Sequence, residues 1–137
     1  MSNPTELRYA PTHEWAKLEG DVVTVGVTAF AIEQLTEPTY LELPAVGTAV
    51  AVGGKFGVIE SYKSTSDLYS PVAGTVVEVN EPLVDDPKTK RKGDPKPVND
   101  SPFHAGWMIK IKLAAGATLD HMLTAEQYDA QLAAEGH

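Results

Sequence analysis

The sequence contains no cysteine, and that absence limits the chemistry open to the protein. Without thiols there can be no disulfide, thiolate metal site or cysteine nucleophile, so any sulfur chemistry requires an added group. Basic residues are also scarce, since 11 Lys and Arg stand against 19 Asp and Glu. The net charge of -8 disfavours contact with phosphate backbones and anionic membranes. We therefore expect no nucleic acid and no membrane among the partners.

Long apolar runs are missing too, because no segment approaches the roughly 20 residues that a membrane span requires. Residues 1–9 are polar and have the pattern of neither a signal peptide nor a transit peptide. We therefore expect a cytoplasmic protein. The hydrophobic fraction of 42% and the charged fraction of 22% are globular values. A length of 137 residues suits one domain, residues 1–137, which we expect to be a monomer.

Short segments with β-branched or alternating residues dominate the chain. They predict strands at residues 21–27, 39–43, 48–52, 56–60, 68–72, 75–80 and 106–113. The last strand should place Met108 on its lysine-bearing face, opposite Ile109. The sequence therefore predicts far more sheet than helix.

Two helices are predicted beside these strands. Thr28 can cap a helix over residues 29–35, which must end before Pro38. The sequence Thr124-Ala-Glu-Gln127 is a capping box and predicts a C-terminal helix over about 124–135, with Tyr128 on its buried side. Residues 81–103 contain five prolines and predict a loop without a packed element. The basic run at 88–92 within it is interpreted as solvated.

Residues 20–27 and 74–80 share one pattern, a glycine followed by a β-branched strand. Two similar halves that fold around each other would bury the apolar faces that each half alone leaves wet. We therefore predict a mainly β fold, a flattened barrel or sandwich of two antiparallel sheets with short helices and a C-terminal helix.

Lys63 lies between two strand-forming runs and has polar neighbours on both sides, so it should project near the tip of a hairpin spanning about 56–74. Most exposed lysines are chemically inert. Here, however, Glu60-Ser61-x-Lys63 followed by Ser66-Asp-Leu-Tyr-Ser-Pro-Val-x-Gly74 closely resembles the lipoylation motif of the glycine cleavage H proteins.

The resemblance extends over nearly the whole chain. Further blocks in the family's order are Tyr9-x-x-Thr12-His-Glu-Trp15, Val25-Gly-Val-Thr28, Leu41-Glu-Leu-Pro-x-Val-Gly47, Val76-x-Glu78-Val-Asn80, Gly106-Trp-Met-Ile-Lys-Ile-Lys112 and Leu123-Thr-x-Glu-x-Tyr128. The resemblance implies a lipoyl-domain fold, lipoate in amide linkage to Lys63, and a carrier rather than an enzyme. The implied partners are glycine decarboxylase, aminomethyltransferase, dihydrolipoamide dehydrogenase and a lipoate-attaching enzyme.

Three carboxylates are candidates for supporting the arm on Lys63, namely Glu60, Asp67 and Glu14. An amine carried by the arm is cationic at neutral pH and would favour a nearby negative charge. For Glu60 and Asp67 two other roles remain open, namely recognition by the lipoate-attaching enzyme and simple solvation of the hairpin. His13-Glu14-Trp15 lacks the i and i+4 histidines of a helical metal site, so we expect neither a metal nor a catalytic residue.

The chain departs from the family after the first predicted helix. Thr36 and Pro38 change the turn there, and Gln34 stands where some members carry histidine. The resemblance implies that this region shields the loaded arm, so protection of the carried group from hydrolysis can differ in this chain. Two other functions also remain: a lipoyl relay for other lipoate-dependent complexes, and an unmodified interaction module on the same scaffold. A biotin carrier is disfavoured, because Tyr62 and Ser64 replace the methionines that flank a biotinylated lysine.

Overall fold

The computed structural model describes residues 3–86 and 88–135. Its larger sheet has six antiparallel strands in the order β1-β2-β3-β9-β8-β5. In chain order these strands are β1 (Arg8–Tyr9), β2 (Glu14–Glu19), β3 (Val22–Val27), β5 (Ala49–Val50), β8 (Gly74–Val79) and β9 (Ile109–Leu113). The two segments that share a glycine-led pattern, at 20–27 and 74–80, form β3 and β8, which lie on either side of β9.

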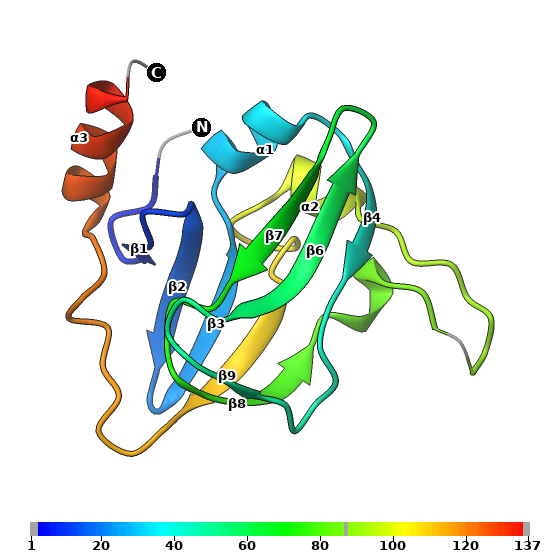
Figure 1. Cartoon of the computed structure of the whole chain (residues 1–137), viewed down its shortest axis with the longest axis horizontal. Helices are drawn as coiled ribbons and strands as arrows, with labels where there is room; N and C mark the ends of the chain where they lie inside the picture. Colours follow the sequence, from blue (N-terminus) through cyan, green and yellow to red (C-terminus); the bar gives the residue numbers. More distant parts are fainter. Residues whose placement is uncertain (1–2, 87, 136–137) are drawn as a thin grey trace.

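The smaller sheet has three antiparallel strands in the order β4-β6-β7, and Figure 1 shows it lying across the larger sheet. Its strands are β4 (Pro38–Glu42), β6 (Lys55–Ser61) and β7 (Thr65–Tyr69). Both sheets keep edge strands, so over the described ranges the fold is an open sandwich of unequal sheets and not a closed barrel. This confirms the predicted fold class in its sandwich form.

The core lies between the two sheets, where alternating strand residues meet. Val25 and Ile111 come from the larger sheet and Leu41, Ile59 and Leu68 from the smaller one, and all five are at most 2% exposed. Strand alternation sends their polar neighbours to the outer faces. Burial of these side chains is worth about 1.5–3 kcal/mol each before entropy is counted. The hairpin of β6 and β7 is thereby fixed to the body along its inner face.

Close approach of β4 and β6 depends on Gly57. A Cβ added at this position would collide with the carbonyl oxygen of Glu42 on β4. Only glycine lets these two backbones come this close. On the other side of β6, the ladder with β7 shifts register between Lys55 and Gly57. The contact between β4 and β6 therefore requires a residue without a side chain at position 57.

Both predicted helices are confirmed. Helix α1 (Ala29–Leu35) begins at Thr28, whose side chain accepts a hydrogen bond from the backbone of Ala31. Helix α3 (Ala125–Ala134) begins with the complete capping box between Thr124 and Gln127. Figure 1 shows α3 beside β1, with the two chain ends at the same end of the molecule.

Several details of the sequence-based prediction were wrong. Strands β1 and β2 were not predicted, because the first half of β2 is buried without alternation, from Glu14 to Ala16. The proline-rich segment is not all loop: it contains a 3-10 helix, η1 (Glu81–Leu83), and a short helix, α2 (Lys96–Asp100), whose Val98 is fully buried. Met108 lies outside β9 and is fully buried instead of sharing the lysine face.

Two strand bounds also differ from the prediction. The predicted strand at 48–52 shrinks to the two residues of β5. Strand β7 begins at Thr65, inside the polar segment that was predicted to separate two strands, and it ends before Pro71. Polar residues form this strand because its outer face and its tip lie in solvent. The hairpin is therefore tighter around Lys63 than the sequence predicted.

Candidate functional site

The tip of the β6–β7 hairpin is a two-residue loop, Tyr62 and Lys63, closed by Ser61 and Ser64. The Ser61 N–H donates to the Ser64 carbonyl at 2.8 Å. The Ser61 hydroxyl accepts the N–H groups of Lys63 and Ser64, each at 3.2 Å. Neither loop residue has a positive φ, so the turn is not of the glycine-dependent hairpin type. Ser61 instead satisfies the loop amides with its side chain, which sets the backbone that presents Lys63.

Lys63 is exposed at this tip, as predicted from its polar neighbours. The adjoining Tyr62 is 87% exposed, so the tip stands clear of the body. None of the ion pairs within 3–86 and 88–135 involves Lys63. Figure 1 shows the tip projecting at the same end of the molecule as α1. Its amine is therefore accessible to an enzyme that modifies lysine.

Glu60 and Asp67 lie on the outer face of the hairpin. Glu60 is half-buried and pairs in register with Tyr40 on β4 and Thr65 on β7, close to the tip. Asp67 lies further along β7 and forms an ion pair with Lys55, 3.3 Å away, rather than with Lys63. The structure thus places both carboxylates on the Lys63 hairpin, with Asp67 already balanced by a neighbouring cation.

Glu14 is in a different environment, because its side chain is only 2% exposed. Its Oε1 accepts a hydrogen bond from the Thr12 hydroxyl, and its Oε2 accepts the Tyr69 N–H at 3.3 Å. Burial raises the pKa of the Glu14 carboxyl to about 7, although both hydrogen bonds act to lower it. Glu14 therefore sits at the end of β7 away from Lys63, poised to change charge near neutral pH.

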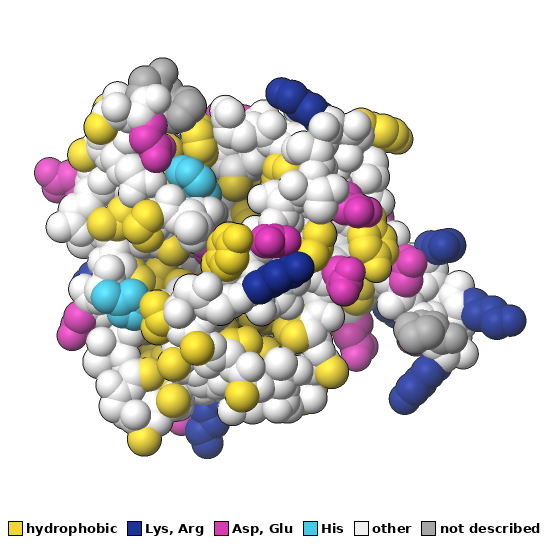
Figure 2. Space-filling view, viewed as in Figure 1, with side chains coloured by type: hydrophobic (Ala, Val, Ile, Leu, Met, Phe, Trp, Pro, Cys, Tyr) yellow, Lys and Arg dark blue, Asp and Glu magenta, His cyan; other side chains and the backbone are white. Residues whose placement is uncertain are grey.

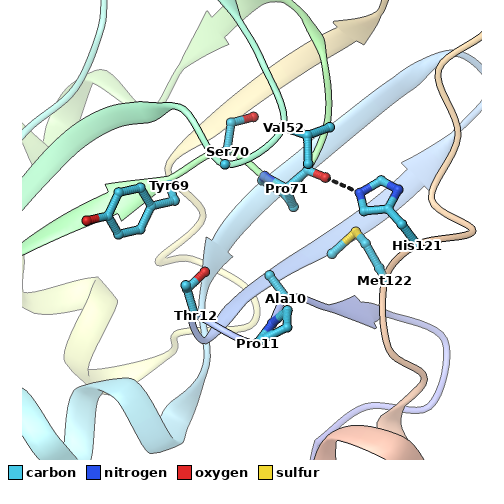
Figure 3. A pocket seen from close by; sticks show the side chains of 10 residues that line it. Ala10, Pro11, Thr12, Val52, Tyr69, Ser70, Pro71, His121 and Met122 are labelled. Carbon is cyan, nitrogen blue, oxygen red and sulfur yellow. Dashed lines mark hydrogen bonds between the residues drawn. The ribbon is translucent and has the colours of Figure 1, made fainter.

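A pocket of about 320 Å³ is lined by Thr12 and Tyr69, which Figure 3 shows, and both are hydrogen-bond partners of Glu14. His121 closes another side and its Nε2 lies 2.6 Å from the Pro71 carbonyl oxygen, as the dashed line in Figure 3 marks. Most of the remaining wall is apolar, with Met122 among its residues. The pocket thus combines an apolar surface with two residues, Thr12 and Tyr69, that bind the buried carboxyl group of Glu14.

One tyrosine hydroxyl connects three distant segments near Glu14. The Tyr128 hydroxyl of α3 lies 2.7 Å from His13 Nδ1 and 2.8 Å from Thr28 Oγ1. The ring of Tyr128 also stacks on Tyr9, with centroids 4.8 Å apart. His13 has a φ of 78°, a conformation that turns the chain just before Glu14. The C-terminal helix therefore holds both the turn before Glu14 and the start of α1.

Sequence reasoning missed several residues of this site. Thr12, His13 and Tyr128 stood inside motifs that the sequence revealed, but no local pattern showed that they meet. Ser61 stood inside the motif around Lys63, but its role in closing the turn was not predicted, and His121 carried no signal at all. The contacts of His121 and Tyr128 join segments far apart in the chain, such as His13 and Tyr128, which are 115 residues apart.

The departures after α1 have a clear structural result. Thr36 ends the helix with φ 70° and ψ -167°, a region that is essentially confined to glycine. Pro38 begins β4 and pairs with Ser61, the residue that closes the Lys63 turn. Gln34 is exposed on α1. The changed turn therefore continues directly into the strand beside the hairpin tip.

Across residues 3–86 and 88–135, no group of three or more His, Asp or Glu is arranged to hold a metal ion. In the same ranges no helix has the length and apolarity to cross a membrane.

Comparison with known proteins gives a consistent result over the full length of the chain. Residues 7–135 match the family described as "Glycine cleavage H-protein". The chain is 47% identical over 132 residues to the glycine cleavage system H protein of Alcanivorax borkumensis, covering 96% of this chain and 97% of that protein. It is 46% identical over 137 residues to the H protein of Nitratidesulfovibrio vulgaris, covering 100% of both.

The fold matches as well. The crystal structure of a glycine cleavage system H protein from Mycobacterium marinum superposes with a TM-score of 0.80 at 34% identity, covering 96% of this chain and 99% of that one. Sequence and fold therefore agree, and this chain belongs to the glycine cleavage H-protein family.

Proposed function

We propose that this chain is the lipoyl-carrying shuttle of the glycine cleavage system, with lipoate in amide linkage to Lys63. It would carry the aminomethyl group of glycine from glycine decarboxylase to aminomethyltransferase. The observation that carries the proposal is the exposed Lys63 at a two-residue hairpin tip, in a chain of this family. On this proposal residues 1–137 form one carrier domain, monomeric and cytoplasmic.

The residues at the tip fit such a modification. Lys63 is exposed, its backbone is held by Ser61, and its ammonium group is not engaged in an ion pair of the described ranges. When bound, lipoate supplies a dithiolane, the sulfur group that a chain without cysteine lacks. The hairpin holds the attachment point on a rigid element, which raises the effective concentration of the arm at each partner site.

The three candidate carboxylates divide by position. Glu60 lies nearest the tip and suits recognition by the lipoate-attaching enzyme. Asp67 and Glu14 follow along β7, Asp67 on the strand itself and Glu14 bound to the N–H of Tyr69 at its end. A carried amine is cationic at neutral pH and would be stabilised beside Glu14 when its carboxyl group is ionised, or beside Asp67 when the amine replaces Lys55 in their exposed ion pair. We infer that Asp67 and Glu14 serve the carried group and Glu60 the attachment step.

The partners follow from the same proposal. Glycine decarboxylase would load the carrier, aminomethyltransferase would unload it, and dihydrolipoamide dehydrogenase would reoxidise it. Each must bind transiently, because the same Lys63 has to visit all of them. The chain itself would act as substrate and carrier rather than as an enzyme.

The first test is intact mass and peptide mapping of the protein purified from its own cells. We expect a lipoyl increment on Lys63 that is absent from Lys63→Ala and Lys63→Arg. Lys55→Arg is the matched control, because Lys55 is an exposed lysine at the other end of the same hairpin. An unmodified Lys63, in cells whose other lipoyl proteins are modified, would refute the carrier function and leave an interaction module.

A second assay separates the glycine system from a lipoyl relay. The modified protein and glycine decarboxylase should together support glycine-dependent exchange of carbon dioxide. A relay for other complexes would be lipoylated on Lys63 and still fail in this exchange.

A further inference from the structure

The Lys63 turn carries one large side chain that the fold does not use. Tyr62 is 87% exposed, the highest value among the exposed large hydrophobic residues of the described ranges. Within residues 3–86 and 88–135 no hydrogen bond or ring contact engages its side chain. The turn does not need an aromatic residue either, because Ser61 holds its amides. The ring of Tyr62 therefore adds surface to the hairpin tip without a contact that stabilises the fold.

The position of Tyr62 is what gives this exposure a meaning. Single exposed apolar residues are common on folded proteins, so exposure alone assigns no role. Tyr62, however, shares a two-residue loop with Lys63, and the Cα atoms of consecutive residues are about 3.8 Å apart. Figure 2 shows basic and hydrophobic side chains projecting where Figure 1 has the hairpin tip. Tyr62 and Lys63 thus stand out from the protein together.

The chemistry at Lys63 fixes how near the attaching enzyme must come. Attachment joins the carboxyl carbon of an activated lipoyl donor, such as an acyl adenylate, to Lys63 Nζ. The new N–C bond forms as the bond to the leaving adenylate breaks, and the amine gives up a proton. Nζ is five single bonds from its Cα, which is at most about 6 Å. An enzyme that holds the donor against this amine therefore has to enclose the tip and cover the residue beside Lys63.

The enzymes that use the finished arm are not constrained in this way. Lipoate adds about seven bonds between Nζ and the sulfur atoms, so the reacting sulfur can lie roughly 14 Å from the backbone of Lys63. These enzymes can act on the sulfur while the tip stays at the entrance of their active sites. Among the proposed partners, the lipoate-attaching enzyme is thus the one that must bury the side chain next to Lys63.

On the basis of the proposed function, we propose that Tyr62 is the anchor by which the lipoate-attaching enzyme recognises this chain. Its ring fills an apolar recess beside the amine-binding site of that enzyme. A tyrosine offers about 150–250 Å² of surface and loses little entropy on burial in an interface. Ser61 orders the loop before binding, so the enzyme meets Tyr62 and Lys63 already in place. Glu60, two residues before Tyr62, borders the same contact with its charge.

The test follows attachment on the full-length, unmodified protein. The lipoate-attaching enzyme is supplied with lipoyl adenylate, and the initial rate of lipoylation on Lys63 is measured by mass over a range of carrier concentrations. Tyr62→Ser removes the ring, whereas Tyr62→Phe keeps the ring and removes the hydroxyl. Val46→Ser is the matched control, because Val46 is 63% exposed and lies beyond the end of β4 that is away from the tip. These exposed positions tolerate substitution without loss of folding.

The variants should separate attachment from the later use of the arm. We expect Tyr62→Ser to lower kcat/KM for attachment about tenfold, mainly through a higher KM for the carrier, while Tyr62→Phe stays within about threefold of wild type and Val46→Ser within about twofold. Once fully lipoylated, Tyr62→Ser should support glycine-dependent exchange of carbon dioxide within about twofold of wild type.

Three results would overturn the proposal. The first is attachment to Tyr62→Ser at the wild-type rate, and the second is an equal loss in Val46→Ser. The third is a loss of carbon dioxide exchange as large as the loss of attachment, which would make Tyr62 a contact for glycine decarboxylase instead. Absence of lipoylation on Lys63 of the unmutated protein would refute the proposed function itself.

Discussion

The buried carboxyl group of Glu14 makes the stability of this protein dependent on pH. Replacing Glu14 with Gln keeps the size of the side chain and most of its hydrogen bonding, but removes the titration. The amide oxygen of Gln can accept the Tyr69 N–H, and its NH2 group can donate to the Thr12 hydroxyl, so both contacts can persist without a charge. Any pH dependence that differs between the two proteins therefore reports on the carboxyl group of Glu14.

The magnitude follows from the raised pKa. In the folded state burial raises the pKa of Glu14 from its ordinary value of 4.5 to about 7, so the native protein binds this proton more tightly than the unfolded chain does. The corresponding free energy is about 3 kcal/mol at ~1.4 kcal/mol for each unit. This stabilisation is complete below the unfolded pKa, near pH 4.5, and is lost as pH rises through 7. Wild type should thus lose about 3 kcal/mol relative to Glu14→Gln between pH 4.5 and pH 8.

Urea denaturation of both proteins across this pH range measures the difference directly, since the other titrating groups cancel in the comparison. A carboxyl ¹³C titration of Glu14 should independently give a midpoint near 7. Parallel stability profiles, or a midpoint near 4.5, would refute the reasoning, because they would mean that hydrogen bonds from Thr12 and Tyr69 outweigh the burial of the charge.

Two further predictions concern the segments around Glu14. Tyr128→Phe removes only the hydroxyl that contacts His13 and Thr28, and α3 should stay docked through the stacking of the ring at position 128 on Tyr9. The free energy of unfolding, measured by urea denaturation, should fall by about 1–3 kcal/mol. A change below ~0.5 kcal/mol would show that the hydroxyl is dispensable. Thr36→Gly should raise the free energy of unfolding by about 1 kcal/mol, because the relief of backbone strain at position 36 exceeds the entropy that glycine adds to the unfolded chain. A lower midpoint in thermal denaturation would contradict the view that the Thr36 backbone is strained.

The elements predicted correctly from sequence are those whose signals are local. Strand β3 follows from a run of β-branched residues, and both helices follow from Thr28 and Thr124, whose caps involve neighbours three residues away. Strand β2 was not predicted because its buried residues, including Glu14, follow one another instead of alternating. Helix α2 was not predicted because the proline-rich composition of the segment did not indicate that Val98 packs in the core.

The same division holds for the candidate site. The sequence by itself singled out Lys63 as the predicted attachment point, because the residues around it form a motif, and its polar neighbours between two strand-forming runs predict the exposed hairpin tip that the structure shows. Only the tertiary structure decided the rest: the burial of Glu14 against Thr12 and Tyr69, and the link from Tyr128 to His13. The physical reason is the distance along the chain between the interacting residues. A helix cap or a turn forms its hydrogen bonds within a few residues, whereas the burial of Glu14, which raises its pKa, depends on segments that meet only when the sheets pack.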